Sequence, residues 1–373
     1  MLFAATMILS ACSSGPQKQD EAAPVIQYPP APEAARYYFE RTLSNSGQVV
    51  ADPGAGRMRR LLTGESQTGD ALGKPFDVTV CRGVVYVSDS VRRRVLAFDY
   101  PGRRYFRIGD DEPGALLKPL GVASDAACNV YVVDGTLARV MIYDARGKYL
   151  SSVGGVAYFK HISHVAVDPA GTRLYIVDTG TVENRDHRIR VFDAKDGKHL
   201  QDIGTRGTEP GKFNLPRDIA LGADGNLYVV DGGNFRIQVF KTDGTHVRAF
   251  GGMGAQFGQF TRPKGIALDG EGRVYVADAA FGNFQIFTPE GQLLLFVGER
   301  ANKGAPGKYL LPAGIHVDED GRVYFVDQYF RKIDVFRPST LPADRGYLAG
   351  NAVVGGSTTG TESRADAAVA PKK

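Results

Sequence analysis

Asp231 and Arg236 form a pair whose residue types and spacing suit acid–base chemistry. Asp231 ends the hydrophobic run LYVVD, is followed by two glycines, and has Arg236 five residues further on. A carboxylate held beside a cation can transfer protons or stabilise developing charge. If the pair were unique in the chain, it would be a candidate catalytic site.

The same aspartate, however, recurs in five other places. LYVVDGGNFRIQVF (Leu227–Phe240) has counterparts such as VYVADAAFGNFQIF (Val274–Phe287). The repeated aspartates are Asp89, Asp134, Asp178, Asp231, Asp278 and Asp327, at spacings of 45, 44, 53, 47 and 49 residues. An enzyme needs one catalytic carboxylate rather than six at equivalent strand ends, and an Asp before a small residue accepts backbone N–H bonds across a turn. We therefore interpret all six as structural residues.

The third copy departs most from the others and offers different chemistry. Its segment FKHISHVAVD contains His161 and His164, and its longer loop TGTVENRDHRIR adds Glu183, Asp186 and His187. Either of these acids, together with His164 and His187, could bind a divalent metal or accept a proton. Because no short-spaced metal signature accompanies them, this catalytic or metal site is the alternative hypothesis rather than the main one.

The elements that would position these residues are short β-strands. Each copy begins with a segment like LPRDIALGADGN (Leu215–Asn226), which is followed by the segment that contains the repeated Asp. A turn and a strand ending in Gly come next, as in HVRAFG (His246–Gly251). Apolar runs bounded by Asp-Gly and Pro favour strands over helices. Four strands per copy, repeated at about 45 residues, are typical of β-propeller blades, which bury both faces only in a closed ring.

The segment from Gly211 to Phe240 resembles the NHL repeat, and the resemblance covers residues 72–337 in six copies. It implies an all-β fold, a six-bladed β-propeller of four-stranded antiparallel blades over residues 35–340. The absence of Trp excludes WD repeats. We expect an N-terminal strand to complete the last blade, from RYYFERTL (Arg36–Leu43) or RRLLTGE (Arg59–Glu65). The Ala-, Gly-, Ser- and Thr-rich residues 341–373 are predicted to be a disordered tail.

In such a propeller, the residue after the recurring Pro borders one mouth of the channel. Copy by copy this residue is predicted to be Phe76, Leu120, His164, Arg217, Lys264 and Ala313, with Ser163 replacing the Pro of the third copy. The next residue is predicted to be Asp77, Gly121, Val165, Asp218, Gly265 and Gly314. The predicted ligand-binding rim comprises Asp77, His164, Arg217, Asp218, Lys264, Glu183, Asp186 and His187.

The N-terminus MLFAATMILSAC resembles the lipobox of bacterial lipoproteins, although no Lys or Arg precedes its apolar run. The resemblance implies that residues 1–12 are a signal peptide and that Cys12 is lipidated, with residues 13–34 as a flexible linker. Ser13, rather than Asp, follows Cys12. In the resembling family this favours the outer membrane, so we expect an envelope protein anchored there and facing the periplasm.

The other two cysteines, Cys81 and Cys128, fall at equivalent turns of successive copies and should lie on one face. An exported protein meets an oxidising compartment. Two interpretations remain open at this point, a disulfide and a pair of buried free thiols.

Composition narrows the function without identifying it. The 373 residues carry a formal charge of only +4, which is too weak to imply a polyanionic partner. No nucleophile elbow, phosphate loop or CxxC motif is present. We therefore expect a monomeric, non-enzymatic binding propeller for a protein, peptide or glycan partner, with no cofactor required. The alternative is a lyase or hydrolase assisted by a divalent metal, and RNA binding is disfavoured by export.

Overall fold

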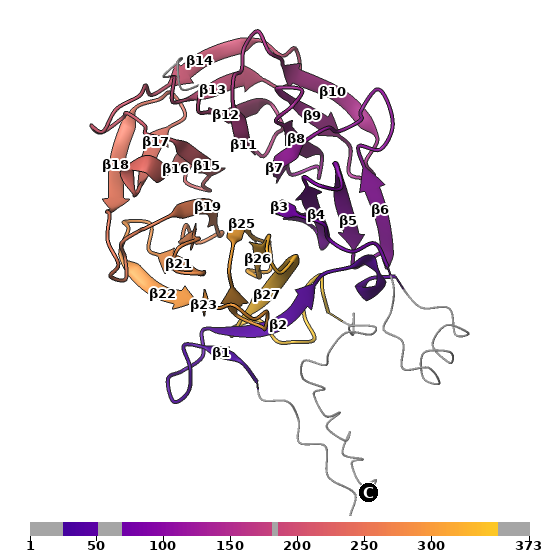
Figure 1. Cartoon of the computed structure of the whole chain (residues 1–373), viewed down its shortest axis with the longest axis vertical. Coiled ribbons are helices and arrows are strands. Elements are labelled where there is room, and N and C mark those ends of the chain that lie inside the picture. Colours follow the sequence, from indigo (N-terminus) through magenta and orange to yellow (C-terminus); the bar gives the residue numbers. More distant parts are fainter. Residues whose placement is uncertain (1–24, 51–68, 181–185, 350–373) are drawn as a thin grey trace, which may run out of the picture.

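Five of the six repeat copies each form an antiparallel four-stranded sheet, and the sixth forms a sheet together with two N-terminal strands. The six sheets stand as blades around a central channel (Figure 1). The computed structural model describes residues 25–50, 69–180 and 186–349. The predicted all-β, six-bladed propeller is therefore confirmed.

The blades are built from consecutive strands. Blade 1 consists of β3 (Pro75–Cys81), β4 (Val84–Asp89), β5 (Arg94–Asp99) and β6 (Arg104–Ile108), and blade 2 of β7 (Pro119–Ser124), β8 (Val130–Asp134), β9 (Arg139–Tyr143) and β10 (Tyr149–Gly154). Blade 3 consists of β11 (Ile162–Val167), β12 (Arg173–Asp178), β13 (Arg188–Asp193) and β14 (His199–Ile203), and blade 4 of β15 (Pro216–Leu221), β16 (Asn226–Asp231), β17 (Arg236–Lys241) and β18 (His246–Gly251). Blade 5 consists of β19 (Pro263–Leu268), β20 (Val274–Asp278), β21 (Asn283–Phe287) and β22 (Leu293–Val297).

Blade 6 combines both ends of the described chain. It consists of β25 (Pro312–Val317), β26 (Val323–Asp327), β27 (Lys332–Pro338) and β2 (Tyr37–Leu43), extended by β1 (Gln27–Tyr28). A short parallel pair, β23 (Glu299–Arg300) and β24 (Lys308–Tyr309), and two 3-10 turns, η1 (Ser46–Gln48) and η2 (Gly232–Asn234), complete the elements of the described residues. None of the helices in these ranges has the length and apolar character needed to cross a membrane.

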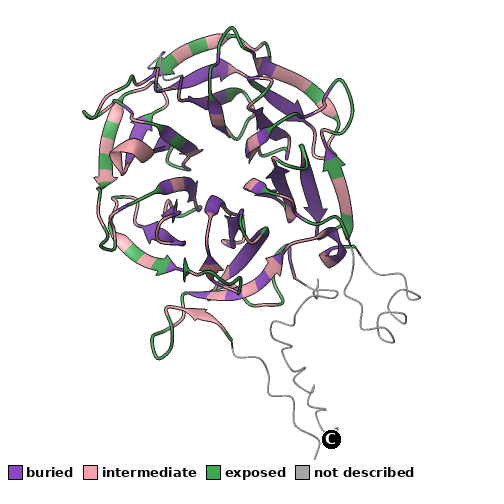
Figure 2. Ribbon diagram, in the orientation of Figure 1, coloured by how far each residue is buried: buried purple, intermediate pink, exposed green. Residues whose placement is uncertain are grey.

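Burial along each blade follows the residue pattern of its strands. The second and third strands are nearly continuous apolar runs and are buried, whereas the fourth strand alternates, as in β18 (Figure 2). This contrast is expected because the middle strands contact neighbouring blades on both faces, while the outermost strand shows one face to solvent. Hydrophobic clusters fill the space between adjacent blades all the way around the ring.

The ring closes as predicted by an N-terminal strand. β2 pairs antiparallel with β27, which places Phe39 opposite Phe336. The second candidate for this strand, Arg59–Glu65, lies outside the described residues. Closure joins the two ends of the chain in one sheet, so the circle cannot open without breaking this ladder.

Two predicted boundaries need correction. The predicted linker of residues 13–34 is too long at its C-terminal end, because β1 pairs with β2 and Tyr28 packs edge-to-face against Phe336 at a ring distance of 5.6 Å. The predicted tail starts too early, because Leu348 is only 1% exposed and the backbone of Arg345 accepts a hydrogen bond from Arg322 at 2.9 Å. Both errors have the same cause. Each segment consists mostly of polar or small residues in the sequence, but contains an apolar side chain that packs against the propeller. Residues 1–24, with Cys12, and residues 350–373 lie outside the description.

A disulfide joins Cys81, at the end of β3, to Cys128, in the turn before β8, with Cα atoms 5.6 Å apart. Of the two interpretations left open by the sequence, the structure has the disulfide. It links blade 1 to blade 2.

Candidate functional site

The channel is lined by the innermost strand of every blade. Neighbouring innermost strands contact each other around the whole circle, from β3 to β7 and onward to β25 and back to β3. They enclose a cavity of about 150 Å³, which Asp77, Asp218 and His316 help to line. We name the end where these strands begin the first mouth and the end where they finish the second mouth.

Four cations stand at the first mouth. We call Lys74, Arg217, Arg262 and Lys264 the basic collar. Burial lowers the pKa of Lys264 to about 8, and repulsion from the other three cations lowers it further than Asp327 raises it. Burial and Arg262 likewise lower the pKa of Arg217. Among the described residues, no carboxylate forms an ion pair with a collar side chain.

The structure corrects the predicted register of the third copy. Ile162 pairs with Asp178, just as Pro216 pairs with Asp231 in blade 4, so Ile162 rather than Ser163 occupies the proline position. His164 is therefore the second residue after that position and is equivalent to Asp218. The turn between β11 and β12 is one residue longer than its counterpart between β15 and β16. Placing the proline position at the common distance before the repeated aspartate therefore gives Ser163 instead of Ile162.

Asp77, His164 and Asp218 consequently form one buried layer beneath the collar, with 6%, 8% and 5% of their surface exposed. They lie below the rim on which the sequence placed them. Phe76 packs over His164 with ring centroids 5.3 Å apart. Nδ1 of His164 is buried and has no hydrogen-bond partner in the described structure. Burial lowers the pKa of His164, and the opposing charge of Asp77 does not reverse this.

The two acids of this layer connect neighbouring blades. Asp77 Oδ2 accepts the Val122 N–H of blade 2 at 2.9 Å, and Asp218 Oδ2 accepts the Ile266 N–H of blade 5 at 2.9 Å. A side chain at Gly314 would collide with Asp77, which explains a glycine at that position. Burial raises the pKa of both carboxyl groups to about 7.

These raised pKa values predict that Asp77 and Asp218 stabilise the propeller less as the pH rises from about 4 to about 7, while His316, whose pKa burial lowers to about 4, acts in the opposite direction. The unfolded chain releases the two protons near pH 3.8 and the folded chain near pH 7, so the folded state binds more protons between these values. Urea unfolding at pH 5 and pH 8 measures the effect. We expect Asp218→Asn to reduce the decline and Asp243→Asn, on an exposed turn, to leave it unchanged. A decline that Asp218→Asn does not alter would contradict the prediction.

Of the residues proposed to surround His164, the two that the structure describes, Asp186 and His187, have other partners. His187 is 5% exposed, and its Nδ1 accepts the Leu215 N–H at 3.1 Å. Asp186 lies 3.3 Å from Arg188, and Glu183 falls outside the described residues. The described part of the chain contains no group of three or more His, Cys, Asp or Glu that could hold a metal ion.

The six repeated aspartates share one structural role, as the sequence suggested. Each accepts backbone N–H groups from the loop before the innermost strand and, in most blades, from the turn after its own strand. Asp231 also binds Arg236 at 2.9 Å, so the pair that suggested catalysis holds a turn.

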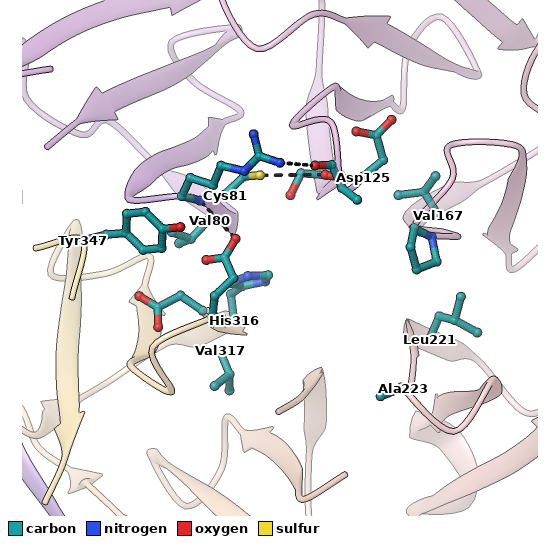
Figure 3. A pocket seen from close by; sticks show the side chains of 16 residues that line it. Val80, Cys81, Asp125, Val167, Leu221, Ala223, His316, Val317 and Tyr347 are labelled. Carbon is teal, nitrogen blue, oxygen red and sulfur yellow. Dashed lines mark hydrogen bonds between the residues drawn. The ribbon is translucent and has the colours of Figure 1, made fainter. Parts of the chain in front are cut away.

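Sequence reasoning missed a second hollow, a cavity of about 520 Å³ at the second mouth (Figure 3). Five blades and Tyr347 of the C-terminal segment contribute to its wall. His316 is the one large residue at a strand position that is otherwise Thr or Ala: Thr79, Ala123, Ala166, Ala220 and Ala267. This difference between copies is the signal that could have found it.

The six-bladed ring contains repeats of a known family. Residues 213–240 and 260–288 match the NHL repeat family. NHL repeat-containing protein 3 of Mus musculus is 39% identical over 83 residues, which are 22% of this chain and 22% of that relative. The chain thus aligns with about a fifth of the length of this curated relative, and it carries NHL repeats in a six-bladed ring.

Solved structures share the fold at low identity. A gluconolactonase, XC5397 from Xanthomonas campestris, superposes with a TM-score of 0.56 at 16% identity, covering 85% of this chain and 98% of that one. A catalytically inactive virginiamycin B lyase from Staphylococcus aureus superposes with a TM-score of 0.51 at 15% identity, covering 71% and 80%. At these identities the likeness shows the fold alone.

Proposed function

We propose that the protein is a non-enzymatic binding propeller that holds a carboxylate-bearing protein, peptide or glycan at its first mouth. The observation that carries this proposal is the basic collar. Lys74, Arg217 and Arg262 help to lower the pKa of Lys264, and Arg262 that of Arg217. The four cations are therefore held together at an electrostatic cost, which an anionic partner would relieve. Because the net charge is only +4, we expect such an attraction to come from the collar rather than from the whole surface.

The collar can be tested with a fluorescein-labelled hexaglutamate peptide at low ionic strength. We expect Arg217→Ala combined with Lys264→Ala to weaken binding by roughly tenfold, because two of the four collar charges are removed. The exposed pair Lys195→Ala and Lys198→Ala, between β13 and β14, removes the same charge elsewhere and should change affinity little. Equal losses in both double variants, or no binding by the wild type, would reject the collar as the site.

A second candidate function is acid–base catalysis as a lyase or hydrolase. The neutral, unpartnered Nδ1 of His164 and the carboxyl of Asp77, with a pKa of about 7, are suited to proton transfer at the first mouth. A gluconolactonase and a virginiamycin B lyase share this fold, so a catalytic function is a candidate to be tested. A turnover assay on lactones and cyclic depsipeptides with wild type and His164→Gln decides it. Activity that His164→Gln leaves intact would rule out this site.

We also propose that a lipid on Cys12 tethers the propeller to the bacterial outer membrane, facing the periplasm. The lipobox-like Leu9–Cys12 supports the anchor, and the Cys81–Cys128 disulfide suits an oxidising compartment. Metabolic labelling with an alkyne fatty acid should mark the wild type and not Cys12→Ser. Equal labelling of both would exclude Cys12 as the anchor.

A further inference from the structure

The cavity at the second mouth has aliphatic side chains on one side and an imidazole beside a valine on the other. Figure 3 shows Val167 and Leu221 on one side and His316 and Val317 on the other, with Tyr347 at the edge. Its volume of about 520 Å³ falls within the range of small-molecule sites, roughly 300–1,000 Å³. It lies at the opposite end of the channel from the basic collar, so a ligand here would not compete for the collar.

The acids that border this cavity already have partners. Asp125 accepts hydrogen bonds from the Ala127 and Asn129 N–H groups at 2.9 and 2.8 Å, and from the Tyr131 hydroxyl at 3.0 Å. Asp318 likewise accepts two backbone N–H groups of the turn after β25, and the Tyr324 hydroxyl of β26 at 2.8 Å. These carboxylates stabilise their own turns and are not available to pair with a charged ligand.

Arg82 and Glu319 also border the cavity. Arg82 donates from Nη2 to the Ala126 carbonyl at 2.8 Å, and Glu319 Oε1 accepts the backbone N–H of Arg82 at 3.1 Å. In the described structure the two side chains form no ion pair with each other, so the Arg82 guanidinium keeps its charge at the edge of the cavity. The rest of the wall offers apolar side chains and the imidazole of His316 to a ligand.

His316 presents a hydrogen-bond acceptor rather than a charge. Burial lowers its pKa to about 4, so the ring is neutral at physiological pH. A hydrogen bond between the ring and the Val80 backbone acts in the opposite direction and raises the pKa. The partner is therefore the Val80 carbonyl, because accepting from the ring favours its protonated form. One ring N–H is then donated to Val80, and the other ring nitrogen keeps its lone pair.

We propose that the second-mouth cavity binds a small, uncharged aromatic alcohol whose hydroxyl donates to the free ring nitrogen of His316. The ring of the ligand lies against Val167, Leu221 and Val317. Tyr347, 40% exposed at the edge of the cavity, supplies an aromatic neighbour. A carboxylate lacks this hydroxyl donor, and the group that would attract it is the Arg82 guanidinium rather than His316.

Equilibrium dialysis with three naphthalene derivatives tests this site. We expect 2-naphthol to bind saturably at one site, and 2-methoxynaphthalene, which lacks the donor, to bind about fivefold more weakly. The anion 2-naphthoate lacks the hydroxyl donor, so its binding should not depend on His316 and should be unchanged in His316→Phe. His316→Phe keeps a flat ring but removes the acceptor, so it should abolish the preference for 2-naphthol over its methyl ether.

A second variant keeps the test decisive if His316→Phe does not fold. Ala223 is an exposed residue of the cavity wall, and Ala223→Trp would fill the hollow and reduce 2-naphthol affinity by roughly tenfold. Lys264→Ala, at the other mouth, should leave affinity unchanged. Uptake that does not saturate, an affinity unaffected by Ala223→Trp, or equal binding of 2-naphthol and its methyl ether would overturn the proposal.

Discussion

Removing the Cys81–Cys128 disulfide is expected to lower the free energy of unfolding by about 4 kcal/mol. The two residues are 47 positions apart, and the bond closes a loop that spans most of blade 1 and enters blade 2. An open loop of this size gives the unfolded chain many more conformations. Urea unfolding of Cys81→Ala combined with Cys128→Ala, compared with the oxidised protein, measures the loss.

Reduction provides the matched control. In a Cys12→Ser background, a thiol reductant should destabilise the protein to about the level of the double Ala variant, and it should not affect the double variant further. Equal stability of the oxidised and reduced protein would contradict the role of the disulfide.

Asp278→Ala should be about equally destabilising, by roughly 4 kcal/mol. Asp278 is fully buried and accepts the N–H groups of Thr261, Arg262, Ala280 and Phe281 at 2.8, 3.0, 2.8 and 3.2 Å. Alanine would leave these donors without an acceptor, and each buried unpaired donor costs about 1–3 kcal/mol unless water reaches it. Thermal and urea unfolding should both show the loss.

Asp144→Ala is the control for this substitution. Asp144 also accepts two backbone N–H groups of a turn, both at 2.9 Å, but at an exposed position where water can replace it. We expect a loss of about 1 kcal/mol or less for Asp144→Ala. A similarly small loss for Asp278→Ala would show that the repeated aspartates do not hold the loops between blades.

Local pattern was sufficient to predict the fold. The strands of blades 1 to 5 pair with neighbours only a few residues away along the chain, and the apolar runs and Asp turns of each copy specify that pairing. Closure by β2 was predictable because one strand was missing from the last copy. The short attachments at β1 and Leu348 were not, because each depends on one or two side chains finding an apolar surface on blade 6.

The site was less predictable than the fold, and His164 shows why. A turn longer by one residue between β11 and β12 changed its assignment from the rim to the buried layer. Since side chains alternate along a strand, an error of one residue exchanges one environment for the other. Arg217 and Lys264, whose copies keep the common spacing, lie at the mouth as predicted.

The sequence by itself determined the repeated blades, their number, and the structural role of Asp231. All three depend on interactions within one copy or on the comparison of similar copies. Only the tertiary structure decided what the two mouths are. Each mouth takes a few residues from each of several blades, and the distances between these residues depend on strand register and ring closure. The basic collar, the layer of Asp77, His164 and Asp218, and the cavity at His316 exist only once the circle is closed.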